Sequence, residues 1–350
     1  EKGFELSEAS NTPVFLELRI RACHVHGSFE AKDNRSPLIS RRHVLENSDF
    51  DFARVCLPPA TYAQEKHKIQ VRWPAAVSFI REHKLNEVFP GAGASDDVGI
   101  ICQGGLYNAT MRALQQLGLS DTFGGTKIPV YCLNVTYPLV SEEVVQFCAG
   151  KRAVLVVEEG QPAFIEDAVH ATLRRYAQDA SPSQSSVNVT KVHGKDVLPP
   201  AGEYTNEVVL TGIARFIETS APRGLDTRDI SKVHERLAAA KNRAAELLGA
   251  PVPARQPGFC VGCPERPVFS AMKIIERETG AFHISADIGC HTFSTLAPFN
   301  IGNTVLGLGL GLASNAAVDS MFGRRTVTVM GDGGFWHNGL TSGVANAVFN

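Results

Sequence analysis

The sequence lacks the features that would assign it to several broad classes of protein. Its formal net charge is only −2, so it carries no electrostatic signature of binding to nucleic acid or to an anionic membrane. Its apolar runs are too short to span a bilayer, and one of the longest, Val305–Ala317, is interrupted by glycines. It has no N-terminal signal peptide. These absences predict a protein that binds neither membranes nor nucleic acid.

Cysteine is too sparse for a disulfide framework. Eight cysteines are scattered along 350 residues, which favours a reducing, cytoplasmic environment. The composition, 44% hydrophobic and 20% charged, is typical of globular proteins, and the length accommodates two or three domains. The chain begins at Glu1 instead of Met, and both ends fall inside predicted elements. We therefore expect an internal fragment of a longer polypeptide.

Hydrophobic patterning indicates two α/β domains. Val98–Gln103, Pro129–Val135 and Arg152–Glu158 are apolar runs without alternation, and each is followed by helical periodicity. Such runs are typical of buried strands in a parallel sheet. The predicted organisation is the C-terminal end of a preceding domain in 1–30, a connector in 31–95, an α/β domain in 96–192, a helical connector in 193–254 and a second, incomplete α/β domain in 255–350.

Helices and strands are also predicted outside these three strands, from periodicity and from Pro or Gly breaks. A short helix near the N-terminus is expected to precede a strand at Val14–Ile20. The other predicted elements are helices at Pro74–His83, Ser141–Ala149, Phe164–Tyr176, Thr205–Thr219, Ile230–Leu248 and Arg266–Glu278, strands at Phe282–Ala286 and Thr326–Met330, a glycine-rich helix at about Ile301–Val318 and a helix from Gly339.

The sharpest local motif, Gly331-Asp332-Gly333-Gly334, follows a predicted strand and precedes a predicted helix. Open α/β sheets bind ligands at such strand ends. Glycines let the backbone approach a diphosphate closely, and the following amides face the anion. The Asp332 carboxylate can hold a hard cation such as Mg²⁺. For the bare Gly-Asp-Gly motif, the alternative is a tight turn capped by an aspartate.

Three cysteines form a second group of candidate ligands. Cys260 and Cys263 lie in a Cys-x-x-Cys turn, and Cys290 follows the next predicted strand. Such a turn can place two thiolates on one ion or cluster. An iron–sulfur cluster, a zinc ion and simple packing of the thiols as small hydrophobes all remain open. Both metal interpretations need a fourth ligand, which the sequence does not identify.

Two further motifs have simpler interpretations. Gly307-x-Gly309-x-Gly311 departs from the dinucleotide-binding fingerprint, because its third glycine comes one residue early and it lies within an apolar run. We expect these small residues to let a helix pack tightly. The pair Glu158-Glu159 at a strand end is predicted to form a polar turn and a helix start, in preference to a catalytic pair.

Several strings, taken together, resemble one enzyme family. Gly331–Asn350 (GDGGFWHNGLTSGVANAVFN), Phe259–Pro267 and Asp287–Phe293 are similar to the indolepyruvate:ferredoxin oxidoreductase family, in particular its long, fused bacterial members. The resemblance extends to segments that would belong to its transketolase-C-terminal-like domain and to the end of its pyrimidine-binding domain. Those segments are Asp97–Leu119, Ile128–Glu159 and Phe4–His24.

This resemblance implies a thiamine-diphosphate-binding fold for the last segment and an activity for the parent enzyme. The family oxidatively decarboxylates aryl 2-oxo acids such as indolepyruvate, with coenzyme A accepting the acyl group and ferredoxin the electrons. It implies thiamine diphosphate and Mg²⁺ as cofactors, with Asp332 as a Mg²⁺ ligand. The remaining implied roles are a diphosphate cradle of Gly331, Gly333 and Gly334, a pocket lining of Asp287, Ile288, Gly289 and His291, a catalytic position for His337 and a [4Fe–4S] site at Cys260, Cys263 and Cys290.

The resemblance also predicts what these 350 residues cannot do alone. The second Mg²⁺ ligand of such sites follows one strand further on, and the activating glutamate belongs to the pyrimidine-binding domain. We therefore expect the fragment to be inactive by itself and the full-length protein to be a homodimer. Two alternatives remain: a thiamine-dependent decarboxylase without electron transfer, and a non-catalytic α/β scaffold with a structural metal site.

Overall fold

The computed structural model describes residues 1–19, 26–28, 30, 31, 33, 55–92, 95–179, 190–225, 228–250, 252, 253, 256–323 and 325–349. Cys23, Asn350 and most of the predicted connector between residues 31 and 54 lie outside these residues. The chain divides into two compact units, Glu1–Leu247 and Leu248–Asn350. No helix in the described residues has the length and apolar content needed to cross a membrane.

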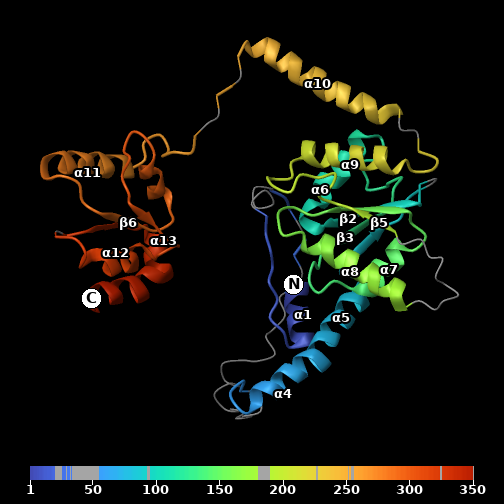
Figure 1. The fold of residues 1–350 in the computed structure, drawn as a ribbon, viewed down its shortest axis with the longest axis horizontal. Coiled ribbons are helices and arrows are strands. Elements are labelled where there is room, and N and C mark those ends of the chain that lie inside the picture. Colours follow the sequence, from blue (N-terminus) through green and yellow to red (C-terminus); the bar gives the residue numbers. More distant parts are fainter. Residues whose placement is uncertain are drawn as a thin grey trace. The chain divides into compact units, whose positions relative to one another are not determined.

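Unit 1 contains a five-stranded sheet in the order β1-β3-β2-β4-β5 (Figure 1). Strands β2, β3, β4 and β5 are parallel, and β1 pairs antiparallel with β3 at one edge. The strands are β1 (Glu87–Phe89), β2 (Val98–Gln103), β3 (Val130–Leu133), β4 (Ala153–Val157) and β5 (Lys191–His193). The predicted parallel α/β arrangement is confirmed.

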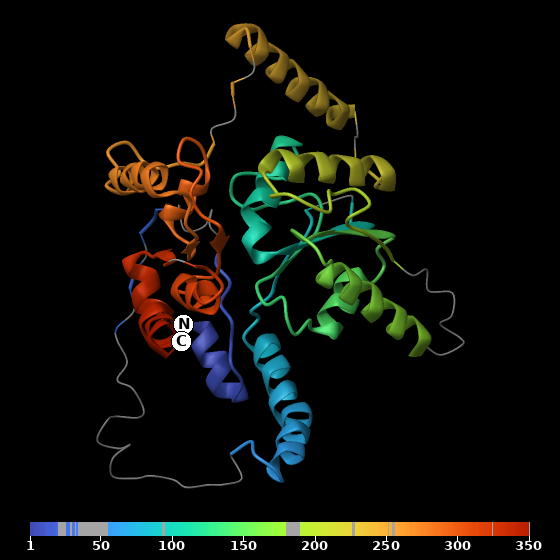
Figure 2. The same cartoon turned by 60° about the vertical axis from the view of Figure 1, so that its left-hand side comes forward.

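Helices cover both faces of this sheet. The helices of unit 1 are α1 (Lys2–Ser10), α4 (Ala60–His67), the π-helical η2 (Lys68–Arg72), α5 (Trp73–Glu82), the 3₁₀-helical η3 (Gly104–Leu106), α6 (Tyr107–Gln116), α7 (Ser141–Cys148), α8 (Phe164–Asp179), α9 (Asn206–Ser220) and α10 (Arg228–Leu248). Helices α6 and α9 lie against one face of the sheet, and α7 and α8 lie against the other (Figure 2).

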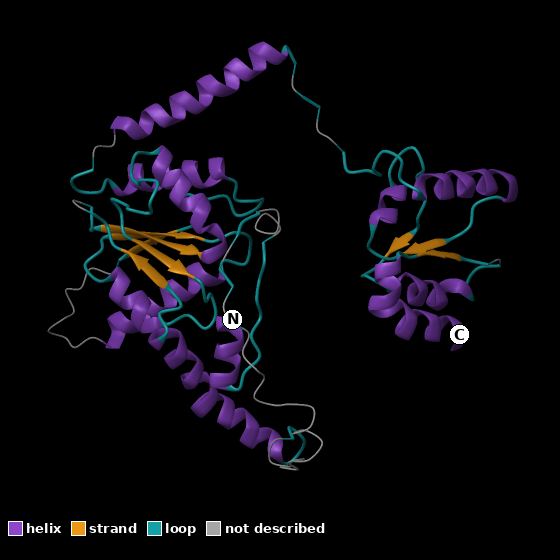
Figure 3. Ribbon diagram, turned by 180° about the vertical axis from the view of Figure 1, so that it is seen from behind, coloured by secondary structure: helices purple, strands orange, loops and turns teal. Residues whose placement is uncertain are grey.

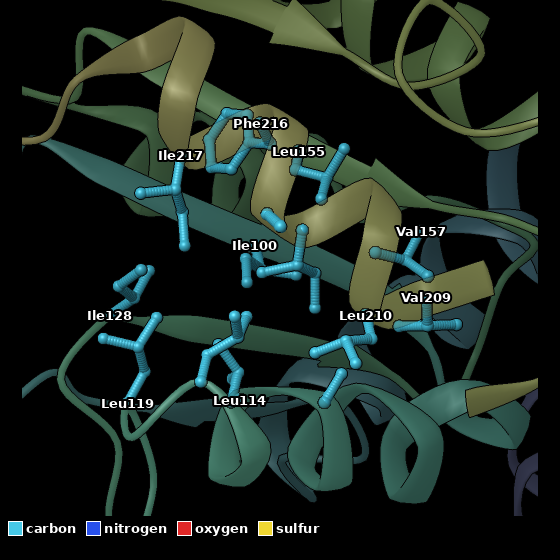
Figure 4. Close-up of a cluster of buried hydrophobic side chains, with 14 of the residues drawn as sticks. Ile100, Leu114, Leu119, Ile128, Leu155, Val157, Val209, Leu210, Phe216 and Ile217 are labelled. Atoms are coloured by element: carbon cyan, nitrogen blue, oxygen red, sulfur yellow. The ribbon is translucent and has the colours of Figure 1, made fainter. Parts of the chain in front are cut away.

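Successive side chains of each strand point to opposite faces of the sheet, as strand geometry requires. In β2, Ile100 packs with α6 and α9, whereas the next residue, Ile101, packs with α7 and α8. Figure 4 shows the first of these cores, in which Leu114 of α6 and Ile217 of α9 approach strand residues such as Leu155. All of these side chains are fully buried, so the sheet is a rigid support for the loops at its ends.

Two predictions for unit 1 are wrong. Helix α9 belongs to the core and not to a connector, because Val209, Leu210 and Ile213 are buried against the sheet. The strand predicted at Val14–Ile20 is not formed in its described part, residues 14–19. Phe15 and Leu16 are 90% and 80% exposed there, so no sheet covers the apolar residues that suggested a strand.

Unit 2 contains a three-stranded parallel sheet in the order β7-β6-β8. The strands are β6 (Ile284–Ala286), β7 (Thr304–Val305) and β8 (Val327–Val329). Helix α11 (Glu265–Thr279) lies on one side of this sheet, and α12 (Gly311–Asp319) lies on the other (Figure 3). Helix α11 contributes Phe269 to a small core with Ile284, Phe299 and Ile301.

A continuous helical segment follows β8. It consists of α13 (Asp332–Gly334), the π-helical η6 (Phe335–Val344) and α14 (Ala345–Phe349). The predicted helix start at Gly339 is therefore wrong, because the helix begins at the Gly-Asp-Gly motif. The glycine-rich helix predicted from Ile301 is also wrong at its start. Helix α12 begins only at Gly311, after β7 and a turn in which Gly309 has a φ of +78°, a conformation that favours glycine.

Candidate functional site

The carboxyl ends of β6 and β8 lie side by side, because these strands are parallel neighbours with Ala286 opposite Val329. Asp287, Ile288 and Gly289 follow β6, and Gly331 follows β8. The chain enters a helix directly after Gly289 and again directly after Gly331: the 3₁₀-helical η5 (Cys290–Thr295) and the helix that starts at Asp332. The structure thus brings together the two strand-end motifs that the sequence predicted as one pocket.

Asp287 and His291 form the buried part of this region. Asp287 is 0% exposed and His291 is 3% exposed. The His291 ring donates from Nε2 to the backbone oxygen of Asp287 at 2.9 Å, and the same nitrogen lies 2.5 Å from Asp287 Oδ1. The other carboxylate oxygen, Oδ2, accepts the backbone N–H of Gly309 at 2.9 Å. Ile288 and Gly289, by contrast, are exposed.

Gly309 is a member of the site that the sequence did not predict. It belongs to the Gly307-x-Gly309-x-Gly311 motif, which was interpreted as helix packing. That interpretation holds for Gly311, where a Cβ would lie 2.7 Å from the backbone carbon of Ala286. Gly309 has an additional role as a hydrogen-bond donor to Asp287. Its left-handed backbone conformation places its N–H group toward Asp287. That conformation could not be predicted from the sequence.

The Gly-Asp-Gly turn presents an exposed carboxylate at this edge. Asp332 is exposed, and its Oδ1 accepts the backbone N–H of Gly333 at 2.9 Å. Gly334 is buried, and a Cβ at this position would overlap Asp287 Oδ2. The glycines therefore allow a close approach of backbones, and Asp332 offers hard oxygen donors beside them. These residues fit a diphosphate that is held through a divalent cation.

His337 lies in η6, on the helix that starts at Asp332. Its side chain is exposed. It is therefore accessible to solvent.

The cysteines occupy two neighbouring segments. Cys260 and Cys263 lie in one turn, closed by a 3.2 Å hydrogen bond from the Cys263 N–H to the Cys260 carbonyl. Phe259 packs edge-on against Phe293, three residues after Cys290, with ring centroids 5.9 Å apart. Cys260 and Cys290 are exposed, so packing as small hydrophobes is wrong for these two thiols.

The described arrangement does not form a ready-made metal centre. Within the described residues, no three His, Cys, Asp or Glu side chains are placed so that they could hold one metal ion. The three cysteines therefore lie in adjacent segments without converging on a common point. An iron–sulfur cluster does not fit them as they stand.

Comparison with known proteins adds independent information. Residues 85–205 match the family model described as the indolepyruvate ferredoxin oxidoreductase middle domain. The chain is 29% identical over 359 residues to the indolepyruvate oxidoreductase subunit IorA of Methanothermobacter thermautotrophicus, and 26% identical over 364 residues to that of Pyrococcus abyssi. The family resemblance is confirmed. Each alignment covers 99% of this chain and 50% of the relative, so the chain spans about half the length of these relatives.

A likeness to a solved structure is weaker. The 2-oxoglutarate:ferredoxin oxidoreductase from Magnetococcus marinus, with 2-oxoglutarate, coenzyme A and succinyl-CoA bound, aligns with 61% of this chain and 30% of its own chain. The sequence identity is 19% and the TM-score is 0.31. The family match, residues 85–205, begins just before β1 and ends at the residue that precedes α9.

Proposed function

We propose that the chain is part of a thiamine-diphosphate-dependent oxidoreductase. The complete enzyme would oxidatively decarboxylate an aryl 2-oxo acid of the indolepyruvate type to an acyl-CoA and pass the electrons to ferredoxin. The observation that carries this proposal is the meeting of Asp332 and the buried Asp287–His291 pair at adjacent strand ends. The similarity to indolepyruvate oxidoreductase subunits along 99% of the chain supports it.

The proposal assigns each unit a place in the enzyme. Residues 255–350 would form most of the diphosphate-binding domain of the thiamine-diphosphate-binding fold. Residues 96–192, within the matched middle domain, would correspond to a transketolase-C-terminal-like domain. In the full-length protein, which we expect to be a homodimer, a pyrimidine-binding domain would complete the thiamine site. The isolated 350 residues are accordingly expected to lack turnover of indolepyruvate.

Individual residues take defined roles in this proposal. Asp332 would hold Mg²⁺, which would neutralise charge on the diphosphate, and Gly331, Gly333 and Gly334 would let the backbone approach the phosphate oxygens. The exposed Ile288 and Gly289 would line the pocket from the end of β6, and the buried Asp287 and His291 would form the layer behind them. When bound, thiamine diphosphate supplies the nucleophilic carbon that attacks the keto group; the protein orients it and excludes competing reactions.

His337 is proposed as the catalytic histidine. It is exposed, and it lies on the helix that begins at the Mg²⁺ ligand Asp332. An imidazole there could donate or accept a proton near the reacting centre. Replacing His337 with Ala is expected to lower kcat while leaving the affinity for thiamine diphosphate unchanged.

The cysteines are proposed as ligands of a [4Fe–4S] cluster in the full-length protein. The exposure of Cys260 and Cys290 and the Phe259–Phe293 contact between the two segments support this. Their separation in the described residues favours the alternative, a decarboxylase without electron transfer. Anaerobic iron and sulfide analysis of the full-length protein and of Cys260→Ser decides between them: about four irons, lost in the variant, would establish the cluster.

Calorimetry with Mg²⁺ and thiamine diphosphate tests the cofactor assignment. The full-length protein is expected to bind the pair, and Asp332→Ala is expected to abolish binding. Asp319→Asn is the matched control, since Asp319 also accepts a backbone N–H, from Thr326 at the amino end of β8. Unchanged binding by Asp332→Ala, or no binding by the unaltered protein, would refute the thiamine proposal.

A further inference from the structure

We propose that Asp287 is a positioning residue that acts through the backbone of Gly309 and does not itself touch the cofactor. This inference rests on the proposed function, because it concerns the same pocket. Asp287 follows β6 at the centre of the sheet of unit 2, and its side chain is 0% exposed. A carboxylate so enclosed is separated from any ligand by the groups that surround it.

One carboxylate oxygen connects three segments of the chain. Oδ2 accepts the N–H of Gly309 at 2.9 Å, in the turn that precedes α12. The same oxygen fills the space beside Gly334, where a Cβ would overlap it. Gly309 and Gly334 are themselves in close contact, since a Cβ at Gly309 would overlap the Gly334 carbonyl oxygen. Asp287 therefore fixes the distance between the end of β6, the Gly309 turn and the Gly-Asp-Gly turn.

The second oxygen lies next to His291. Oδ1 lies 2.5 Å from His291 Nε2 and has no aligned hydrogen bond in the described residues. The His291 ring in turn lies between two glycine turns, with its Cε1 atom 4.0 Å from where a Cβ of Gly331 would be and against Gly289. The Asp287–His291 pair thus contacts the segments on both sides of the pocket from the protein interior.

Packing alone does not explain an aspartate here. A buried carboxylate costs free energy unless both oxygens are offset by partners, and an apolar side chain of similar volume would avoid that cost. The carboxylate is explained if its acceptor oxygen is needed to hold the Gly309 N–H. A diphosphate site requires such fixed backbone geometry, because its donors must not reorganise when the ligand binds.

The test compares three variants of the full-length protein. Asp287→Ala removes the acceptor and should raise the Kd for Mg²⁺–thiamine diphosphate about tenfold or more, as expected for a hydrogen bond to a charged group. Asp287→Asn retains an acceptor for Gly309 and should change the Kd by less than about threefold. Asp319→Asn should leave it unchanged.

Amide hydrogen exchange in the cofactor-free protein provides a second readout. The Gly309 amide should exchange slowly in the unaltered protein and in Asp287→Asn, and fast in Asp287→Ala. If the unaltered protein binds no thiamine diphosphate, the proposed function fails. The exchange rate of the Gly309 amide still tests whether Asp287 holds this N–H group. A normal Kd together with slow Gly309 exchange in Asp287→Ala would overturn the inference.

Two further results separate positioning from other roles. If Asp287→Asn loses binding as completely as Asp332→Ala, the charge itself contacts the metal or cofactor and the inference is wrong; this comparison suffices even if Asp287→Ala does not fold. The variant Asp287→Leu fills the same space with an apolar side chain and does not restore the acceptor. Its binding should stay weak, and binding equal to that of the unaltered protein would show that Asp287 acts by packing.

Discussion

The carboxylate of Glu158 accepts the backbone N–H of Ile165, with the nitrogen 2.9 Å from Oε1, and the N–H of Glu166 at 3.1 Å from Oε2. Both donors lie in the first turn of α8, where helix N–H groups have no partner within the helix. Glu158 thus caps α8 from the end of β4. The pair Glu158-Glu159 was predicted to form a polar turn and a helix start; the helix begins later, at Phe164, and Glu158 contributes its cap.

Removing this cap should destabilise unit 1. Glu158→Ala leaves two N–H groups without their acceptor in a site that is 4% exposed, so we expect a loss of about 1–3 kcal/mol in the free energy of unfolding. Urea denaturation measures it. Glu218→Ala, on the exposed side of α9, should change stability by less than about 0.5 kcal/mol. Equal effects of the two variants would contradict the capping role.

Glu159 connects Arg19 to the end of the sheet strand β4. It forms an ion pair with Arg19 at 2.8 Å and accepts the Tyr204 N–H at 2.6 Å. Because the Arg19 and Glu159 side chains are each only 24% exposed, a double-mutant cycle with Arg19→Ala and Glu159→Ala should give a coupling of about 1 kcal/mol. The exposed pair Arg243–Glu246 should give a coupling near zero. No coupling in the first pair would show that the contact is not maintained.

Asp196 makes the stability of unit 1 sensitive to acid. Partial burial raises the pKa of its carboxyl, but hydrogen bonds from the Gly194 N–H and the His193 ring more than compensate, so the pKa lies below its ordinary value. A lowered folded-state pKa contributes stability above the unfolded pKa of about 4, which is lost as the pH falls through the folded value.

The half-exposed side chain limits this contribution to less than about 1 kcal/mol. Unfolding midpoints measured from pH 6 to pH 3 should fall less steeply in Asp196→Asn than in the unaltered protein. Asp179→Asn, an exposed position near the end of α8, should retain the original pH dependence. An unchanged slope in Asp196→Asn would refute the assignment.

Thiol labelling should divide the cysteines into two classes. Burial raises the pKa of Cys148 to about 12, so at pH 8 almost none of it is the reactive thiolate. Cys260 and Cys290 are exposed and should react with iodoacetamide in the native, metal-free protein, whereas Cys148 should react only after unfolding. Mass spectrometry of peptides after brief labelling checks this. Fast native labelling of Cys148 would contradict its burial.

Much of unit 1 could be predicted from sequence, because its strands are buried on both faces. The run Val98–Gln103 coincides with β2, since a parallel strand covered by helices needs no alternation to be recognised. The strand predicted at Val14–Ile20 is not formed in residues 14–19, because no second layer covers its apolar residues. Apolar residues indicate burial only where a partner covers them, and Phe15 and Leu16 are exposed.

The site was predicted where it depends on local sequence and missed where it depends on the fold. Gly331 and Asp332 lie at a strand end, as the pattern of strand, glycine and acid indicates. The hydrogen bond from Gly309 to Asp287 joins residues that are distant in the chain. Only the parallel pairing of β6 with its neighbours and the left-handed turn at Gly309 bring them together.

A side chain at position 334 would overlap Asp287. This overlap also has an evolutionary consequence. The two positions share one volume, so a residue larger than glycine at 334 can be accommodated only if residue 287 becomes smaller. Related sequences should therefore vary at 287 and 334 together, and the pair should give a covariation signal as strong as that of directly paired strand residues such as Ala286 and Val329.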